Sequence, residues 1–200
     1  MCIRDSEWGN GVVKECCSLK FLGMPEGKEM LPSYFCDGCV QLEHISVPHT
    51  VTRLWDYVFD KCTALQEVTL PDDVTDIGRH VFENCSCMTE MILSSMLKRI
   101  GGQVFQECRI LEKVVIPDGI DEIVDSMFSG CYTLTEIVIP KSVTTVSRYS
   151  FENCQCMKRY YFLPDSPPEL TTTGTFLGLP KDCKFYVPKG RLDVYQTAEN

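Results

Sequence analysis

The 200-residue sequence has no run of about 18 apolar residues, so we predict no membrane-spanning helix. Its opening, "MCIRDSEWGNG", lacks a basic start followed by an apolar stretch, so no signal peptide is visible. The first six residues fit none of the patterns described below and are interpreted as a non-native or misread start. No block of like charge stands out, and the net charge of −9 disfavours binding to a nucleic-acid backbone.

Motifs that carry catalysis or hold a cofactor are also missing. The three histidines do not stand at the H-E-x-x-H spacing of a zinc protease, and there is no G-x-S-x-G. The stretch "GMPEGKE" at 23–29 lacks the loop length and the Ser/Thr of a P-loop. We therefore predict no catalytic, cofactor-binding or metal-binding residues. An enzyme would need a convergent cluster on one face, for which the candidates are His44, Glu67, Glu90 and Glu136.

Cysteine, in contrast, is abundant, with 13 residues in the chain. Seven of them recur every 23 residues, which marks an internal repeat, and a period of this length is typical of a solenoid. The phrase Phe-Glu-Asn-Cys-x-Cys-Met at 82–88 returns at 151–157, three periods later. The cysteine column consists of Cys16, Cys39, Cys62, Cys85, Cys108, Cys131 and Cys154.

Apolar residues keep the same step. The positions three, six and eight residues after each cysteine are apolar, apart from Tyr160, and the ninth is proline in most copies, although Ser94 breaks this column. A fourth apolar column comprises Leu54, Ile77, Ile100, Ile123 and Val146. Phenylalanine stands three residues before the next cysteine at Phe59, Phe82, Phe105, Phe128 and Phe151.

Each repeat contains the pattern I-x-I-P, whose alternation predicts a short strand with one buried face. Proline ends that strand because it has no N–H for a ladder. The following V-x-x-I-x-x-x-V-F has three- and four-residue spacing, which indicates a helical turn or an irregular return arc. One such unit cannot offset its chain entropy, so we expect the units to stack and share one core.

The stacking also bears on the cysteines. Equivalent side chains of successive coils point the same way about 4.8 Å apart, whereas a disulfide needs Cβ atoms about 3.8 Å apart. We interpret the column as small buried thiols that fill a tight corner and donate weakly to nearby carbonyls, with disulfides or metal as the less favoured alternatives. "CDGC" at 36–39 has the spacing of a redox pair or half a zinc site. Because Cys39 belongs to the column and Cys36 falls in the phenylalanine column, packing is favoured here too.

The columns resemble the BspA-like (Treponema pallidum type) leucine-rich repeats, whose pattern is C-x-x-L-x-x-I-x-I-P-x-x-V-x-x-I-x-x-x-A-F. The units "CTALQEVTLPDDVTDIGRHVFEN" at 62–84 and "CYTLTEIVIPKSVTTVSRYSFEN" at 131–153 match it closely. The family's alanine is replaced at Val58, Val81, Val104, Met127 and Ser150. The resemblance implies an α/β solenoid, a right-handed coil of 23-residue units with a short-strand parallel sheet on its concave face.

The resemblance covers residues 16–163. Residues 1–15 are interpreted as a worn partial repeat, marked by Trp8, Val12 and Val13, with a start interpreted as non-native. Residues 164–200 resemble the family's closing unit, in which a short strand ending in Tyr-Val-Pro precedes a small helix. In the family this helix commonly continues through a tryptophan and a further strand, so we expect a truncated C-terminal cap.

The outward strand residues are the candidate partner-binding surface. Toward the C-terminal end of the sheet, Ile92, Val115, Val138 and Tyr161 form an apolar line rimmed by charge, as expected of a protein-binding patch. Isolated exposed β-branched residues are also normal in strands, which is the competing interpretation. The candidate residues are His44, Ser46, Glu67, Thr69, Glu90, Ile92, Lys113, Val115, Glu136, Val138, Arg159 and Tyr161.

Two functional hypotheses follow. The resemblance implies a non-catalytic, monomeric module that binds a protein ligand on the concave face. It would act at a cell surface or as a secreted protein, in adhesion or in binding to host or matrix proteins. The alternative is an intracellular leucine-rich repeat scaffold in the cytoplasm, which the many thiols favour because that compartment keeps them reduced. Neither hypothesis involves nucleic acid, membrane insertion by this segment or a cofactor.

Overall fold

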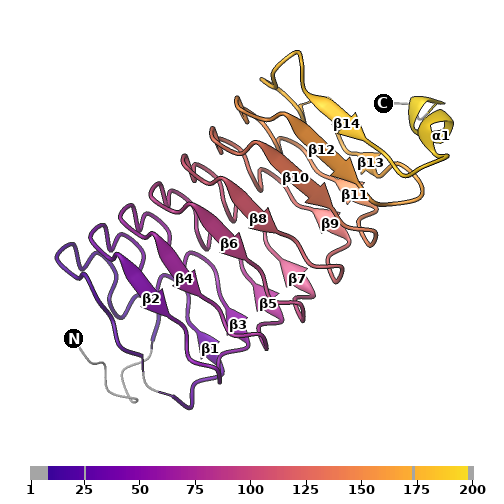
Figure 1. Cartoon of the computed structure of the whole chain (residues 1–200). Coiled ribbons are helices and arrows are strands. Elements are labelled where there is room, and N and C mark those ends of the chain that lie inside the picture. The colour runs from indigo at the N-terminus through magenta and orange to yellow at the C-terminus, as the bar shows by residue number, and fades with distance from the viewer. Residues whose placement is uncertain (1–8, 25, 173, 198–200) are drawn as a thin grey trace.

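The computed structural model describes residues 9–24, 26–172 and 174–197. The unassigned opening, Trp8 of the partial repeat and Pro25 of the proline column lie outside the described residues. The chain winds into an elongated coil, with residue number rising steadily from one end to the other (Figure 1). Within the described residues, no helix has the length and apolar character that crossing a membrane requires.

The alternating I-x-I segments form the first row of parallel strands along this coil (Figure 1). Most neighbours are offset by 23 residues, as in the pairing of Ile45 with Val68 and of Ile137 with Tyr160. Hydrogen bonding divides the row into the sheets β2–β4, β6–β8 and β10–β12–β14. The strands are β2 (His44–Ser46), β4 (Glu67–Thr69), β6 (Glu90–Ile92), β8 (Lys113–Val115), β10 (Glu136–Ile139), β12 (Arg159–Phe162) and β14 (Lys184–Tyr186).

A second row of parallel strands occupies the segment for which a helical turn or an irregular arc was expected. Each strand has two residues, and in five of the seven strands one of them belongs to the fourth apolar column; they pair as β1–β3–β5–β7 and β9–β11–β13. The strands are β1 (Met30–Leu31), β3 (Arg53–Leu54), β5 (Asp76–Ile77), β7 (Arg99–Ile100), β9 (Glu122–Ile123), β11 (Thr145–Val146) and β13 (Glu169–Leu170).

The fold is therefore a parallel-strand β-solenoid of about seven turns, and the α/β class is not confirmed. The one helix in the described residues is α1 (Leu192–Thr197), near the C-terminus. The physical reason is that neighbouring coils already satisfy the main chain on the return arc, so three- and four-residue apolar spacing does not require a helix there.

The third side of each coil consists of turns that are also hydrogen-bonded between coils. The amide of Phe82 donates to the carbonyl of Val104 in the next coil (3.0 Å), and Asn84 donates to Gln106 (2.8 Å). Most turns contain two left-handed residues, at a cost of about 1–2 kcal/mol for each one that is not glycine. The non-glycine residues with φ between 52° and 62° are Glu15, Tyr34, Tyr57, Lys61, His80, Asn84, Gln103, Glu107, Ser126, Tyr149 and Asn153.

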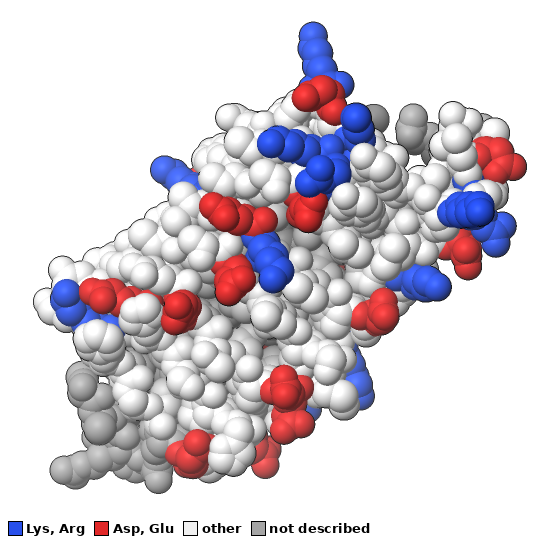
Figure 2. Space-filling view, in the orientation of Figure 1, with Lys and Arg blue, Asp and Glu red and all other residues white. Residues whose placement is uncertain are grey.

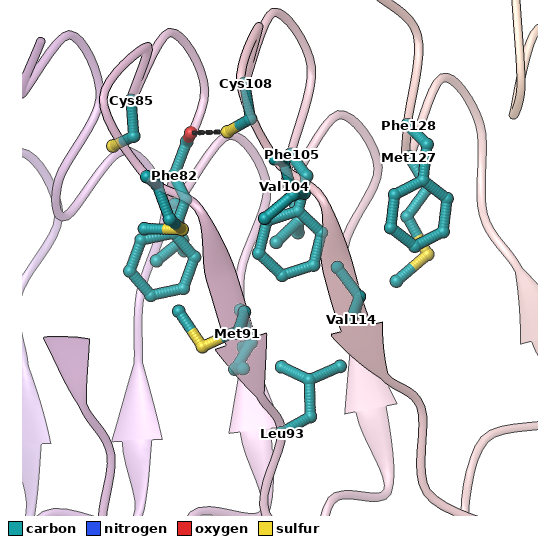
Figure 3. Close-up of a cluster of buried hydrophobic side chains, with 14 of the residues drawn as sticks. Phe82, Cys85, Met91, Leu93, Val104, Phe105, Cys108, Val114, Met127 and Phe128 are labelled. Carbon is teal, nitrogen blue, oxygen red and sulfur yellow. Dashed lines mark hydrogen bonds between the residues drawn. The ribbon is translucent and has the colours of Figure 1, made fainter. Parts of the chain in front are cut away.

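The interior is filled by straight columns of equivalent side chains (Figure 3). The buried phenylalanine rings from Phe59 to Phe151 stack with centroids 5.4–5.7 Å apart and planes within 12° of parallel. Phe176 extends this stack from the C-terminal unit, 5.8 Å from Phe151. The aromatic core is thus continuous across coil boundaries, so a single coil removed from its neighbours would expose ring faces on both sides.

From Cys39 to Cys154 the cysteine column confirms the prediction of buried thiols that donate to carbonyls, whereas Cys16 is half-buried. Cys108 Sγ donates to the carbonyl oxygen of Phe82 at 3.1 Å, from one coil to the preceding one (Figure 3). Cys85, Cys131 and Cys154 make the same bond to the carbonyl 26 residues earlier, at 3.2–3.3 Å. No disulfide joins the twelve cysteines in the described part of the chain.

We predict that Cys108→Ala destabilises the fold by about 1–3 kcal/mol, because it removes a fully buried sulfur and one inter-coil hydrogen bond. The matched control is Cys156→Ala, at an exposed thiol, which should change the free energy of unfolding by less than about 0.5 kcal/mol. Urea unfolding followed by circular dichroism measures both values. Equal effects of the two substitutions would contradict the structural role of the column.

The buried thiols also predict a loss of stability at alkaline pH. Burial raises the pKa of Cys154 to about 12 and raises that of Cys108 further. A thiol with a raised pKa stabilises the fold fully below the unfolded pKa near 9, and this contribution is lost as the pH rises from about 9 towards 12. Each such thiol should lower the free energy of unfolding by roughly 1 kcal/mol per pH unit in that window.

Urea unfolding of the wild type between pH 8 and pH 10.5 tests this pH dependence. The variant Cys108→Ala has one titrating thiol fewer. Its free energy of unfolding should therefore fall less steeply with pH, by roughly 1 kcal/mol per pH unit. Identical slopes for the two proteins would show that the column does not couple folding to proton release.

Candidate protein-binding face

The candidate site is the outward side of the first strand row, here called the strand face. It follows from alternation: the central residue of each strand points inward, and its two neighbours point to solvent. Met91 and Val114 are buried, whereas Glu90, Ile92 and Lys113 beside them are exposed. All twelve candidate residues lie on this face, ten exposed and Arg159 and Tyr161 half-buried; their role in binding stays a prediction.

The first outward column consists of charged side chains from Glu67 onwards. Across successive strands, Glu136 accepts from Arg159 at 2.8 Å, and this hydrogen bond raises the pKa of the guanidinium above its ordinary value. Lys113 lies 4.0 Å from Glu90. These are exposed pairs that water screens, so they orient charge on the face more than they hold it together. The column is His44, Glu67, Glu90, Lys113, Glu136 and Arg159.

The second outward column changes character along the coil. It begins with the polar residues Ser46 and Thr69 and then becomes an apolar line. Ile92 is 63% exposed, Val115 44% and Val138 46%, so each presents a large part of its side chain to solvent. Because parallel strands lie about 4.8 Å apart, these side chains are adjacent and form one strip of apolar surface.

The strand ending in Tyr-Val-Pro and the small helix expected in the closing unit are present as β14 and α1, and β14 extends both outward columns by residues that the candidate set left out. Tyr186 of β14 stacks on Tyr161 with centroids 4.9 Å apart, and Lys184 pairs with Arg159 in register. Lys184 and Tyr186 were left out because their strand, "KFYVP" at 184–188, stands 25 residues after its equivalent in β12 and so falls outside the 23-residue columns. The candidate surface therefore reaches the C-terminal unit.

A groove of about 380 Å³ opens on the strand face where the hydrogen-bonded sheets β2–β4 and β6–β8 meet. Its lining includes Glu67, Thr69, Glu90 and Ile92 from the candidate set. It is therefore a concave, mostly polar depression beside the N-terminal end of the apolar strip.

The arrangement offers little for catalysis. No group of three His, Cys, Asp or Glu side chains in the described residues is placed to hold a metal ion. The "CDGC" cysteines are both fully buried, and Cys39 donates to the carbonyl of Val13 at 3.0 Å. A hydrogen bond from Cys36 lowers the pKa of Cys39, while burial raises that of Cys36. What the face can do is contact another macromolecule with an apolar strip bordered by charge.

Comparison with known proteins places this coil in a family of repeats. A family model described as "BspA type Leucine rich repeat region" matches residues 9–158 in six copies. The crystal structure of a leucine-rich repeat protein of T. pallidum is similar, with 27% identity and a TM-score of 0.71 over 74% of this chain and 70% of that one. No match arises among curated protein sequences.

Two further solved structures share the fold at lower identity. A leucine-rich repeat protein from Bacteroides ovatus has 22% identity and a TM-score of 0.76, over 90% of this chain and 48% of that one. One from Eubacterium ventriosum has 18% identity and a TM-score of 0.69, over 90% of this chain and 57% of that one. The chain thus spans roughly half the length of these two proteins.

We predict that Ile92→Asp is tolerated, with a change in the free energy of unfolding below about 1 kcal/mol, because Ile92 faces solvent. The adjacent Met91→Asp should cost about 3–5 kcal/mol or prevent folding, because it buries a carboxylate in the core. Thermal unfolding of the two purified variants measures the difference. A more severe effect at Ile92 would reverse the assignment of inward and outward positions.

Proposed function

Because the chain belongs to the BspA-type leucine-rich repeat family, we propose that it is a non-catalytic protein-binding module that acts at a cell surface, in adhesion or in binding host or matrix proteins. Leucine-rich repeat proteins are generally protein-interaction modules, and the comparisons show no enzymatic family. The proposed ligand is a protein that contacts the strand face, and the proposed active form is a monomer.

The observation that carries this proposal is the strip formed by Ile92, Val115 and Val138. Strand propensity and cross-strand contacts account for part of this alignment, and a partner that covers the strip gains in addition about 25 cal/mol for each Å² of apolar surface removed from solvent. The adjoining column of Glu90, Lys113 and Glu136 supplies charges of both signs that fix the orientation of the partner. An apolar centre with a charged rim is the common anatomy of protein interfaces.

The second candidate is an intracellular interaction scaffold, which the state of the cysteines favours. The twelve described cysteines are all free, and seven of them are buried. The thiol column works as a set of hydrogen-bond donors, so the fold needs no oxidising compartment. The two candidates share the binding face and differ in compartment, which immunogold labelling of the native protein in intact and permeabilised cells distinguishes.

We predict that the double variant Val115→Glu/Val138→Glu weakens binding to a protein ligand at least about tenfold, because it buries two carboxylates at the centre of the contact. The measurement is surface plasmon resonance on immobilised fibronectin, laminin and collagen, chosen as representative matrix proteins. The wild-type chain should bind at least one of them saturably.

The control is Val40→Glu, which makes the same chemical change at an exposed valine in a turn. It should bind as the wild type does, and circular dichroism should confirm that all three proteins are folded. Equal binding by the strand-face variant and the turn variant would exclude the apolar strip as the site. Absence of binding to every matrix protein would count against the adhesion role and favour the scaffold.

A further inference from the structure

The outward side of the second strand row carries a pocket that the proposed function does not use. It lies over β3, β5 and β7, has a volume of about 400 Å³ and is lined by residues of three successive coils. Ligand sites in proteins usually have about 300–1,000 Å³, so this pocket has the size of a small-ligand site. It is separate from the strand face, because none of its lining residues belongs to the first strand row.

Trp55 forms one wall of the pocket, and its ring is held in place. It directly follows β3 and is 47% exposed. Its indole N–H donates to the sulfur of Met30 in the preceding coil at 3.2 Å. Because the one donor of the indole is used within the protein, the ring is oriented before any ligand arrives, and its exposed surface is left for apolar contact.

Two glycines keep the space beside the indole open. Gly78 and Gly101 occupy the position of Trp55 in the next two coils and line the pocket. A Cβ atom at Gly78 would lie 2.7 Å from the main-chain carbonyl carbon of Trp55, and one at Gly101 would lie 2.5 Å from the main-chain nitrogen of Arg79. Neighbouring coils therefore approach each other too closely here for any side chain to fill the pocket.

Hydrogen-bonding groups of both kinds border this space. Asp76 of β5 accepts a hydrogen bond from Arg99 of β7, and its other carboxylate oxygen lies 3.6 Å from Nε of Arg53 in β3. Although burial raises it, hydrogen bonds from Thr75 and Arg99 bring the pKa of Asp76 below its ordinary value, so the acceptor stays ionised at neutral pH. A guanidinium has five N–H donors, and these contacts use one donor of each arginine, so others remain for a ligand.

The charge of the pocket is balanced, which disfavours an ionic ligand. The lining contains two cationic and two anionic side chains, so its net charge is zero. The two adjoining depressions add one cation and two anions, which changes the net charge only to −1. Figure 2 shows red and blue atoms interspersed along the side on which β3, β5 and β7 lie in Figure 1. The charged residues are Arg53, Asp56, Asp76, Lys98, Arg99, Asp121 and Glu122.

We propose that this pocket binds a neutral oligosaccharide. The C–H groups on one face of a sugar ring carry partial positive charge, and they pack against the negative face of the indole of Trp55. Sugar hydroxyl groups both donate and accept hydrogen bonds, which matches the donors of Arg53 and Arg99 and the acceptor of Asp76. An extended peptide is a poorer occupant, because β3, β5 and β7 already pair with one another and offer no open main-chain edge.

The test uses the full chain with Trp8→Phe, which leaves Trp55 as the sole tryptophan of the sequence. This parent protein is titrated with four neutral tetrasaccharides: cellotetraose, maltotetraose, mannotetraose and N-acetylchitotetraose. At least one of them should change the Trp55 fluorescence saturably, with a Kd below about 1 mM, because a bound sugar ring displaces water from the indole.

Calorimetric titration with the same tetrasaccharide then compares side-chain variants of the parent protein. Trp55→Ala should weaken binding at least about tenfold. Arg99→Met should weaken it about fivefold, because methionine keeps an apolar stem but has no N–H donor. The matched control is Arg148→Met, which removes an equivalent inter-coil contact with Asp125 outside the pocket and should bind as the parent does. Urea unfolding confirms that each variant is folded.

The strand-face variant Val115→Glu/Val138→Glu should bind the tetrasaccharide as the parent does, which separates this site from the proposed function. Four outcomes would overturn the proposal. These are no saturable response to any neutral tetrasaccharide, unchanged affinity of Trp55→Ala, equal effects of Arg99→Met and Arg148→Met, or tighter binding of the acidic tetragalacturonate than of every neutral tetrasaccharide.

Discussion

The structure depends on main-chain hydrogen bonds between coils of equal length. The two strand rows and the turns each bond to the neighbouring coil, so a residue is held at a fixed height above its equivalent 23 positions earlier. A residue inserted within a strand would shift the side chains that follow it out of their columns, whereas the last unit has two extra residues outside its paired strand and the columns continue. The regular sequence period is the consequence of this constraint, and it explains why the inward columns tolerate only a narrow range of shapes.

The cysteine column shows how specific that constraint is. The carbonyl of Phe82 already accepts the amide of Cys85 within its own turn, and the thiol of Cys108 adds a second hydrogen bond from the next coil. A side chain at this corner must be small, largely apolar and still able to donate, and a thiol meets all three requirements. The same group has a raised pKa because it is buried, so packing and alkaline sensitivity have one origin.

The period and the alternation were sufficient to predict the first strand row, the inward columns and the outward candidate residues. The second row of strands was not predictable. A strand of two residues, such as Asp76–Ile77, is too short to show an alternation of apolar and polar residues, and its hydrogen-bond partners are 23 residues away in the sequence. The left-handed turns were hidden because residues such as Tyr57 and Gln103 carry no local signal for that conformation. Lys184 and Tyr186 were missed because the spacing changes at the last unit.

The places where a binding function can reside follow from the same constraint. The inward residue of each strand is committed to the core, so variation is free mainly at its two outward neighbours and at the ends of the coil. The outward columns use this freedom unevenly, changing from Ser46 and Thr69 to Ile92 and Val138 along one face. In the C-terminal unit, Phe185 keeps the inward register position and its ring stacks on that of Tyr160. A repeat protein of this kind can therefore change its contact surface through the outward side chains without disturbing the inward columns that hold the coil together.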